Sequence, residues 1–475
     1  MNPSAQPTFL WHDYETFGAD TRHDRPAEFA CWRTDADFEP VAAPETFRCR
    51  PTLDYLPEPA ACAVTGIGPE AAYAQGLDEP EFAARVHAQM SEAQTCTLGY
   101  NSMRFDDEIT RHLFWRNFID PYEREWARGN SRFDLIDLIR AAYALRPGGL
   151  QWPMREDGHP SFKLTDLSAA NALPHSHAHA ALSDVEATLS LARLLRQAQP
   201  RLLDHALGLR LKARVLEMLD WRRRTPLIHV SQRFPAERGC LAVVVPVAMH
   251  PSQGGKIIVV DAHQDPTPLL EWAPERLAEM IFAPADAPGR VALGLKLVHA
   301  NRAPFLAPLS ALKGVDLARI RLDRAVVDRH CARLRSADGL DERLQQVYRL
   351  LDQQPQTHRD ADSALYDGFI GDADRVLARR FAQADAAGRT QMASQFNDHR
   401  LATLALRFRG RHHLAELDAV ERRLWLEHCR AQLQRPGRAL ADYLAAVDAI
   451  AVDRAELGDD LRRWGDRVSA HAMGE

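Results

Sequence analysis

The 475-residue sequence lacks the features that mark membrane, exported and repetitive proteins. Its longest apolar run, Leu241–Met249, falls far short of the ~20 residues that a membrane helix needs. Residues 1–7 are polar and contain no apolar signal core. No internal repeat is evident, and no stretch is low in complexity. We therefore expect a globular protein that acts in the cytoplasm and has no membrane partner.

Cysteine is scarce and follows no pattern. None of the cysteines forms a Cys-x-x-Cys pair, and their odd number argues against a disulfide framework. A reducing compartment such as the cytosol fits this usage best. The seven cysteines are Cys31, Cys49, Cys62, Cys96, Cys240, Cys331 and Cys429.

An overall excess of positive charge, common in nucleic-acid-binding proteins, is also missing, because the formal net charge is −6. Two stretches are nevertheless locally rich in arginine. Residues 111–146 hold seven arginines against five acids, and residues 400–438 hold nine against four. These arginines could face phosphates or could simply solvate helix surfaces, and charge alone does not decide between the two.

The length exceeds that of one ordinary core, so we expect two or three domains. The first part of the chain alternates strand and helix patterns, as α/β folds do. Strands are predicted over residues 8–12, 29–34, 45–49 and 95–100, and helices over residues 79–90, 106–118 and 182–195.

The pattern changes after a boundary near Gln199-Pro200. Residues 240–249 and 256–261 are β-rich and flank a Pro-Ser-Gln-Gly-Gly turn, which predicts a hairpin, and residues 291–300 resemble a further strand. Beyond about residue 355 the pattern is almost entirely helical. A β-rich middle region and a helical final region are therefore expected.

Two carboxylates stand two residues apart at the end of the first predicted strand, in Asp13-Tyr14-Glu15. Residues two apart face the same side of a strand, so both carboxylates project together. Such a pair repels unless a cation lies between its members, and Mg²⁺ favours oxygen ligands. A solvated strand end is the alternative, and this short pattern does not decide between them.

A third carboxylate, Asp106, follows the strand predicted over residues 95–100 and opens a helix. It could simply cap that helix, since aspartate is favoured at helix N-termini. In α/β folds, however, ligand sites lie at such strand-to-helix junctions.

His179 and Asp184 flank the start of the helix that closes the first region. Taken alone, they could be an exposed histidine and a first-turn acid that the helix dipole favours. His175, His177 and His179 also alternate, as zinc ligands can. No cysteine lies near them and no other histidine repeats the spacing, so we do not expect zinc.

In chain order the motifs are Asp-x-Glu on a first strand, Asn-x₃-Phe-Asp at 101–106 and His-x₄-Asp at 179–184. This set resembles the DEDDh 3′→5′ exonucleases of the RNase H-like fold. Longer stretches look like the bacterial exodeoxyribonuclease I family. They are His-Asp-Tyr-Glu-Thr-Phe-Gly (12–18), Gly-Tyr-Asn with Arg-Phe-Asp-Asp-Glu (99–108), Arg-Asn-Phe-x-Asp-Pro-Tyr (116–122), Tyr-Ala-Leu-Arg-Pro (143–147), Lys-Leu-Val-His (296–299) and Leu-Tyr-Asp-Gly-Phe (365–369).

The resemblance implies three domains. An α/β RNase H-like exonuclease domain would span residues 1–198, an SH3-like β-barrel domain residues 199–354, and an all-α domain residues 355–475. In that family the three form a C-shaped clamp around single-stranded DNA. A clamp formed within one chain leads us to expect a monomer.

The resemblance also implies a reaction, the removal of 5′-nucleoside monophosphates from the 3′ end of single-stranded DNA during repair and recombination. Two Mg²⁺ ions, which Mn²⁺ could replace, would lie ~4 Å apart between the carboxylates. Glu15 would also sense the terminal 3′ hydroxyl. His179 would act as the general base, a task that suits a side chain titrating near neutrality. The implied metal ligands are Asp13, Glu15, Asp106 and Asp184.

DNA contacts carry over by the same match, and each stacked base would contribute roughly 1–3 kcal/mol. The positions that match are Arg111, Tyr122, Trp126, Arg140 and Lys163. Lys163 stands where some relatives carry arginine, which keeps the charge but loses bidentate geometry. Tyr122 and Trp126 could instead pack in a core, although the arginines around them favour exposure.

The family also binds the acidic C-terminal tail of single-stranded-DNA-binding protein, which basic residues of the second and third domains would receive. Two alternatives remain. A proofreading subunit or an oligoribonuclease would share the motifs, but such chains are shorter and do not explain the matches after residue 200. A catalytically dead binding module is disfavoured by the complete set of four carboxylates and a histidine.

Overall fold

The structure is a computed structural model that describes residues 6–175, 180–284, 286–353 and 359–474. Its chain divides into two units. The first unit consists of Met1–Ser131, Ser176–Glu186 and Thr357–Glu475, so segments far apart in the sequence build it together. The second unit consists of Arg132–His175 and Ala187–Gln356.

A five-stranded sheet, in the order β3-β2-β1-β4-β5, forms the centre of the α/β region. β1 pairs antiparallel with β2 and parallel with β4, where Thr8 faces Thr95 and Trp11 faces Leu98. The strands are β1 Thr8–Thr16, β2 Pro26–Thr34, β3 Glu45–Arg48, β4 Thr95–Gly99 and β5 Ser131–Asp134. Helices of the same region are α1 Pro59–Thr65, α2 Pro69–Gln75, α3 Glu79–Met90, α4 Asp106–Arg116 and α7 Ala181–Ala198.

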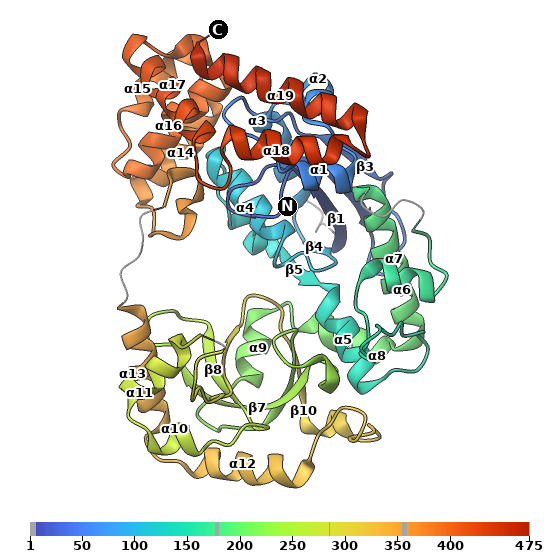
Figure 1. Cartoon of the computed structure of the whole chain (residues 1–475). Helices are drawn as coiled ribbons and strands as arrows, with labels where there is room; N and C mark the ends of the chain where they lie inside the picture. The colour runs from blue at the N-terminus through green and yellow to red at the C-terminus, as the bar shows by residue number, and fades with distance from the viewer. Residues whose placement is uncertain (1–5, 176–179, 285, 354–358, 475) are drawn as a thin grey trace. The chain divides into compact units, whose positions relative to one another are not determined.

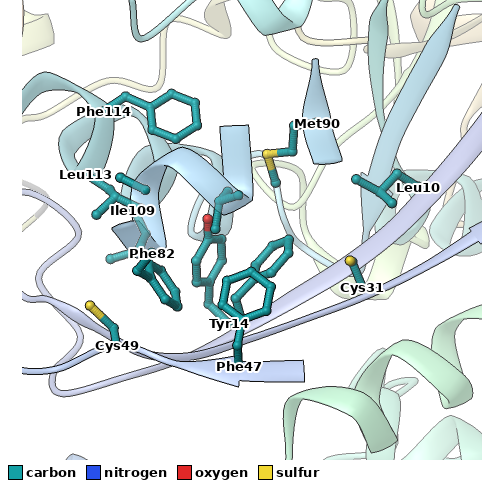
Figure 2. Close-up of a cluster of buried hydrophobic side chains, with 13 residues drawn as sticks. Leu10, Tyr14, Cys31, Phe47, Cys49, Phe82, Met90, Ile109, Leu113 and Phe114 are labelled. Atoms are coloured by element: carbon teal, nitrogen blue, oxygen red, sulfur yellow. The ribbon is translucent and has the colours of Figure 1, made fainter. Parts of the chain in front are cut away.

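One face of this sheet is covered by α3 and α4. Tyr14 and Phe29 of the strands pack with their rings 4.8 Å apart, and Phe47 meets Phe82 of α3 in an edge contact at 5.2 Å. Tyr14, Phe29, Phe47 and Phe82 form one buried cluster with residues of α4, and Figure 2 shows Tyr14, Phe47 and Phe82 on the side of the sheet that faces Leu113 and Phe114. The apolar side chains of α3 and α4 recur at helical spacing, and their burial fixes both helices beside β1.

The final helices belong to the first unit as well. Figure 1 shows α18 and α19, drawn in red, alongside α1 and α2. Trp464 of α19 donates its indole N–H to the carbonyl of Tyr55, and Asp460 accepts from the backbone N–H groups of Glu70 and Ala71 at the start of α2. The helices are α14 Asp372–Gln383, α15 Ala386–Ala393, α16 His399–His412, α17 Ala419–Leu433, α18 Leu440–Ala451 and α19 Ala455–Met473.

A buried ion cluster ties α16 to the α/β region. Arg411 donates to Asp54 at 2.7 Å and to Asp362 at 2.8 Å, and all three side chains are almost fully buried. Burial alone would raise the pKa of Asp54, but Arg411 and His428 hold that pKa well below its usual value. Because a lone charge here would be costly to bury, each member of the cluster depends on its partners.

The second unit is built on another five-stranded sheet, in the order β10-β6-β7-β8-β9, with every neighbouring pair antiparallel. Helices α12 and α13 pack against β7. The strands are β6 Leu227–Val230, β7 Leu241–Met249, β8 Lys256–Asp261, β9 Leu295–His299 and β10 Phe305–Pro308. The helices are α5 Leu135–Leu145, α6 Leu164–Ala170, α8 Pro200–Gly208, α9 Lys212–Met218, α10 Thr267–Glu271, α11 Pro274–Phe282, α12 Arg324–Ser336 and α13 Leu340–Asp352.

The expected α/β beginning, β-rich middle and helical end are all present. The first strand continues to Thr16, so Asp13 and Glu15 lie within it, and the strand predicted over residues 291–300 is shorter, at Leu295–His299. All seven cysteines are buried thiols without disulfide bonds. Within the described residues, no helix is both long and apolar enough to cross a membrane.

Candidate active site

Asp13 and Glu15 lie at the carboxyl end of β1, beyond the last residue that pairs with β4. Parallel strands end at the same edge of a sheet, so the loop after β4 reaches the same place. Glu15 is buried and Asp13 partly exposed, and Glu15 faces Glu28 across the β1–β2 pair. The alternation of a strand thus turns the two carboxylates to one side.

Hydrogen bonds to its side chain and to its carbonyl group hold Asp106 against β1. The N–H of Tyr14 donates to Oδ1 of Asp106 at 3.1 Å, and the hydroxyl of Thr110 donates to the carbonyl of Asp106 at 2.8 Å. Gly99 at the end of β4 permits this approach, since a Cβ there would lie 2.7 Å from the carbonyl oxygen of His12. Asp106 is the first residue of α4, whose N-cap is Phe105, so the expectation that Asp106 caps this helix is wrong. Its side chain instead lies against β1, where it accepts from Tyr14.

Asp184, in the first turn of α7, completes the group. Oxygen atoms of Asp13, Glu15 and Asp184 all lie within 4.8 Å of one another. Asp106 is close enough to raise the pKa of Asp13 by its charge. The four predicted carboxylates therefore converge in the first unit, whereas His179 lies outside the described residues.

The electrostatics of this carboxylate cluster favour a cation. Burial raises the pKa of Asp13 well above its usual value, and Asp106, Asp184 and Glu15 raise it further. Burial likewise raises the pKa of Glu15 to about 8, with Asp184 and Glu28 adding to the effect. The charged groups that raise these two pKa values are all acids, so a bound divalent cation would relieve their mutual repulsion. The donor atoms are all oxygens, which fits such an ion.

Arg111 is only 4 % exposed and is engaged with acids of its own chain. It donates to both oxygens of Glu125, at 2.8 and 3.0 Å, and to Glu108 at 2.8 Å. Its guanidinium also lies 5.3 Å from the ring centroid of Tyr122. In this structure Arg111 therefore holds Glu125 and Tyr122 in place.

The two aromatic candidates differ in exposure. Trp126 is 69 % exposed, as its basic surroundings predicted, and a large exposed ring is suited to stacking. Tyr122 is partly buried against the apolar cluster around Trp115, Phe118 and Phe381. Core packing was the alternative considered for both residues. Tyr122 does pack partly in a core, whereas Trp126 is mostly exposed.

Arg140 and Lys163 belong to the second unit. Arg140 on α5 is buried, donates to Asp137 at 2.6 Å and lies 5.8 Å from the ring of Phe162. Lys163 is exposed and immediately precedes α6.

Many arginines of the two arginine-rich stretches neither solvate helix faces nor face outward. Arg124 donates to Asp107 at 2.6 Å and Arg409 to Glu421 at 2.6 Å, with both guanidinium groups fully buried. Arg407 bridges Asp360 and Asp362. For these residues the local excess of arginine reflects buried ion pairs, because their acidic partners lie in other elements.

Tyr366 contacts helix α4, which was not predicted. Its hydroxyl donates to Glu108 at 2.5 Å and accepts from Arg111 at 3.2 Å, two and five residues after Asp106 on α4. The Leu-Tyr-Asp-Gly-Phe stretch was similar to the family, but residues 255 positions apart leave no spacing signal for such a contact.

Three family models match successive parts of the chain. The "Exonuclease" model matches residues 10–192, the "Exonuclease I SH3-like domain" model residues 210–350, and the "Exonuclease I C-terminal domain" model residues 359–463. Exodeoxyribonuclease I of Escherichia coli (strain K12) is 42% identical over 431 residues, which cover 90% of each chain. The chain belongs to the exodeoxyribonuclease I family.

Members of this family are exonucleases, so the chain is a hydrolytic 3′→5′ exodeoxyribonuclease. A proofreading subunit or an oligoribonuclease, the shorter alternatives, would not explain the matches to the second and third models. The relative from Haemophilus influenzae is 38% identical over 90% of this chain and 91% of its own.

Solved structures agree with the exodeoxyribonuclease I assignment. The E. coli enzyme in complex with a dA16 oligonucleotide has a TM-score of 0.92 and 39% identity, covering 98% of this chain and 100% of that one. Two further structures have a TM-score of 0.90 and the same coverage. They are the zinc-bound E. coli enzyme with single-stranded DNA (39% identity) and an SSB/exonuclease I structure with an inhibitor (38%).

Proposed function

We propose that this chain removes nucleotides one at a time from the 3′ end of single-stranded DNA and releases 5′-nucleoside monophosphates. The observation that supports this most directly is the convergence of Asp13, Glu15 and Asp184 within 4.8 Å, with Asp106 tethered beside them. Its relatives' complexes with single-stranded oligonucleotides favour the same substrate.

The four carboxylates would hold two Mg²⁺ ions, with Mn²⁺ able to replace them. Bound divalent cations would stabilise the charge that develops on the phosphoryl oxygens and lower the pKa of water. The oxygen donors of Asp13, Glu15, Asp106 and Asp184 suit Mg²⁺ better than a soft metal. A relative whose structure contains a zinc ion supports the binding of a divalent cation by this family.

The protein's own groups would move the proton and align the strand. His179 would take the proton from the attacking water as general base, a task suited to a group that titrates near neutrality. The carboxylate of Glu15 would accept from the terminal 3′ hydroxyl, which selects a strand end. Trp126 would offer a stacking surface, while Lys163 would pair with a phosphate.

Arg111 and Arg140 would act on DNA less directly. Arg111 is engaged with Glu108 and Glu125, so it would position Tyr122 for a base. Arg140 donates to Asp137 through one nitrogen, so the rest of its guanidinium group would reach a phosphate.

We place the exonuclease domain at residues 1–198, the SH3-like domain at 199–354 and the helical domain at 355–475. A monomer acting in the cytoplasm, in DNA repair and recombination, is the setting we propose. The acidic C-terminal tail of single-stranded-DNA-binding protein would be a partner, as the SSB/exonuclease I structure supports.

The proposal is tested with single strands labelled at the 3′ or the 5′ end, incubated with Mg²⁺, with Mn²⁺ or with EDTA. A 3′ label should appear at once as mononucleotide, and a 5′ label should shorten in single-nucleotide steps. Chelation should stop both. Release of the 5′ label first, or unchanged degradation in EDTA, would contradict the proposal, and a duplex with blunt ends serves as the control substrate.

A further inference from the structure

Trp126 is held mainly by its neighbours in the chain. Because it is 69% exposed, packing of its own ring does little to fix its position. The short 3₁₀ turn Glu123–Glu125 precedes it, and the backbone N–H of Trp126 donates to the carbonyl of Glu123 at 3.3 Å. We call residues 122–126 the aromatic turn, since this segment begins with Tyr122 and ends with Trp126.

Arg124 anchors the aromatic turn to helix α4 and to strand β4. Its guanidinium group is fully buried and donates to Oδ1 of Asp107 at 2.6 Å and to the hydroxyl of Thr97 at 3.3 Å. Asp107 is the second residue of α4 and directly follows Asp106. One buried arginine therefore ties the turn that carries Trp126 to the helix end that carries a candidate metal ligand.

A second ion pair of opposite polarity lies beside the first. Glu125 accepts from Nε and Nη2 of Arg111, at 2.8 and 3.0 Å, and its side chain is only 8% exposed. In the first pair the aromatic turn supplies the cation and α4 the anion, whereas in the second pair the roles are exchanged. A shift of the turn by one residue would bring like charges together, so the two pairs fix its register on α4.

The chemistry of the pair between Arg124 and Asp107 indicates a geometric role. A buried ion pair is often no more stabilising than an apolar pair of the same volume. Among the described residues, Nε of Arg124 has no hydrogen-bond partner, which removes part of the compensation for its burial. Glu123 pairs with Arg379 at the surface, where an ion pair restrains the chain less. The buried pair therefore specifies the position of the turn more than it adds stability.

We propose that Arg124 is a positioning residue, which holds the exposed ring of Trp126 at a set distance from the carboxylate cluster. The inference rests on the proposed function and deepens it. A base stacked on Trp126 would then bring the strand into register with Asp106 and the carboxylates of β1, although Arg124 itself touches neither the base nor the metal ions.

The test is a double-variant cycle on binding of the full-length protein to a fluorescent oligothymidylate in EDTA. Loss of one stacked base corresponds to at least about fivefold weaker binding, which Trp126→Ala should show. Arg124→Met should weaken binding by a similar factor in the wild-type background. In the Trp126→Ala background it should change binding by less than about twofold, because it acts through that ring. Arg124→Lys keeps a cation beside Asp107 and should restore most of the affinity.

Arg409→Met provides the matched control. The guanidinium group of Arg409 is also fully buried in the first unit, where it pairs with Glu421. Its loss should lower the free energy of unfolding, as Arg124→Met does, and leave the dissociation constant unchanged. Glu125→Gln removes a charge from the aromatic turn at nearly constant shape, so it carries the same cycle if Arg124→Met does not fold. It should weaken binding only when Trp126 is present.

Wild-type affinity in Arg124→Met, or in Glu125→Gln where that variant carries the cycle, would overturn the inference. An equal weakening by Arg409→Met would do the same, and so would losses that add in the double variant with Trp126→Ala. A wild-type protein that fails to bind the oligothymidylate would instead refute the proposed function itself.

Discussion

The backbone N–H of Tyr14 donates a hydrogen bond to Oδ1 of Asp106, 92 residues further along the chain. This bond brings the start of α4 against the end of β1, between two candidate metal ligands, Asp13 and Glu15. The hydroxyl groups of Tyr14 and Thr110, which lies one turn into the helix, are also hydrogen-bonded at 3.0 Å. The backbone of Tyr14, which lies between Asp13 and Glu15, thus fixes the position of the Asp106 carboxylate.

Gly99→Ala should disturb this arrangement. A Cβ on Gly99 would lie 2.7 Å from the carbonyl oxygen of His12 and 2.9 Å from Cβ of Ser102, so β1 and the loop before α4 must separate. We expect a loss of about 1–3 kcal/mol in the free energy of unfolding, measured by urea denaturation, and reduced exonuclease activity. Gly148→Ala is the control, since nothing lies within 4 Å of its Cβ position. Equal stability of the two variants would contradict the expected clash.

Asp184→Ala should abolish digestion of a labelled single strand while binding to the strand in EDTA largely survives. The physical reason is that the carboxylate belongs to the cluster that would hold the metal ions, whereas the bases would be contacted by other groups. Asp453→Ala removes an exposed carboxylate and should digest at the wild-type rate. Near wild-type activity of the Asp184 variant would remove the metal assignment.

His179→Ala should reduce the single-turnover rate roughly 10²–10⁴-fold, as expected for a lost general base. The measurement is rapid-quench cleavage at saturating Mg²⁺. His175→Ala, a neighbour in the same alternating run, provides the matched control. A drop of less than about tenfold would mean that another group accepts the proton.

Arg411→Met should destabilise the first unit by about 3–5 kcal/mol, because Asp54 and Asp362 would remain buried without their shared partner. Thermal and urea unfolding would measure the change. Arg462→Met removes an exposed arginine that pairs with Asp448 and Asp459 on the protein surface, and should alter stability little. Similar stabilities of the two variants would show that the buried cluster contributes nothing.

The destabilisation by Arg411→Met should depend on pH. In the wild type, burial opposes ionisation, but Arg411 holds the pKa of Asp54 and of Asp362 well below the ordinary value. A lowered pKa stabilises the fold above the unfolded value of about 3.9, and this contribution is lost as pH falls through the folded pKa. The stability difference between wild type and variant should therefore be largest near neutral pH and shrink in acid. A difference that grows in acid would contradict this sign.

Local patterns predicted much of the fold. The helix Glu79–Met90 follows from the helical spacing of its buried side chains. Strand β1 was also predicted, although it is buried along most of its length and its burial does not alternate. The short strands β5, β6 and β10, each of four residues, were not predicted. These three segments carry too little periodicity to indicate a strand, and their pairing with neighbouring strands gives them their form.

Local patterns also predicted one part of the site, the pair of carboxylates on β1. Asp13 and Glu15 share one strand, so their common direction is a local property. Their meeting with Asp106 and Asp184 depends on tertiary packing, and the prediction of that meeting came from the resemblance to a family. No local rule linked Arg111 to Tyr366 or Arg411 to Asp54, because each pair joins residues more than 250 positions apart. Local sequence patterns cannot predict buried charge partners of this kind.

The first unit requires helix α19, whose Trp464 donates to Tyr55 and whose Asp460 caps α2. During synthesis, therefore, residues around Tyr55 leave the ribosome some 400 positions before their packing partners exist. The apolar surface around Tyr55, Cys62 and Ala72 must wait, uncovered, while the intervening segments are made. The core between the sheet and helices α3 and α4 draws only on residues 10–114, so the covering of the Tyr55 surface is the late event in the maturation of the protein.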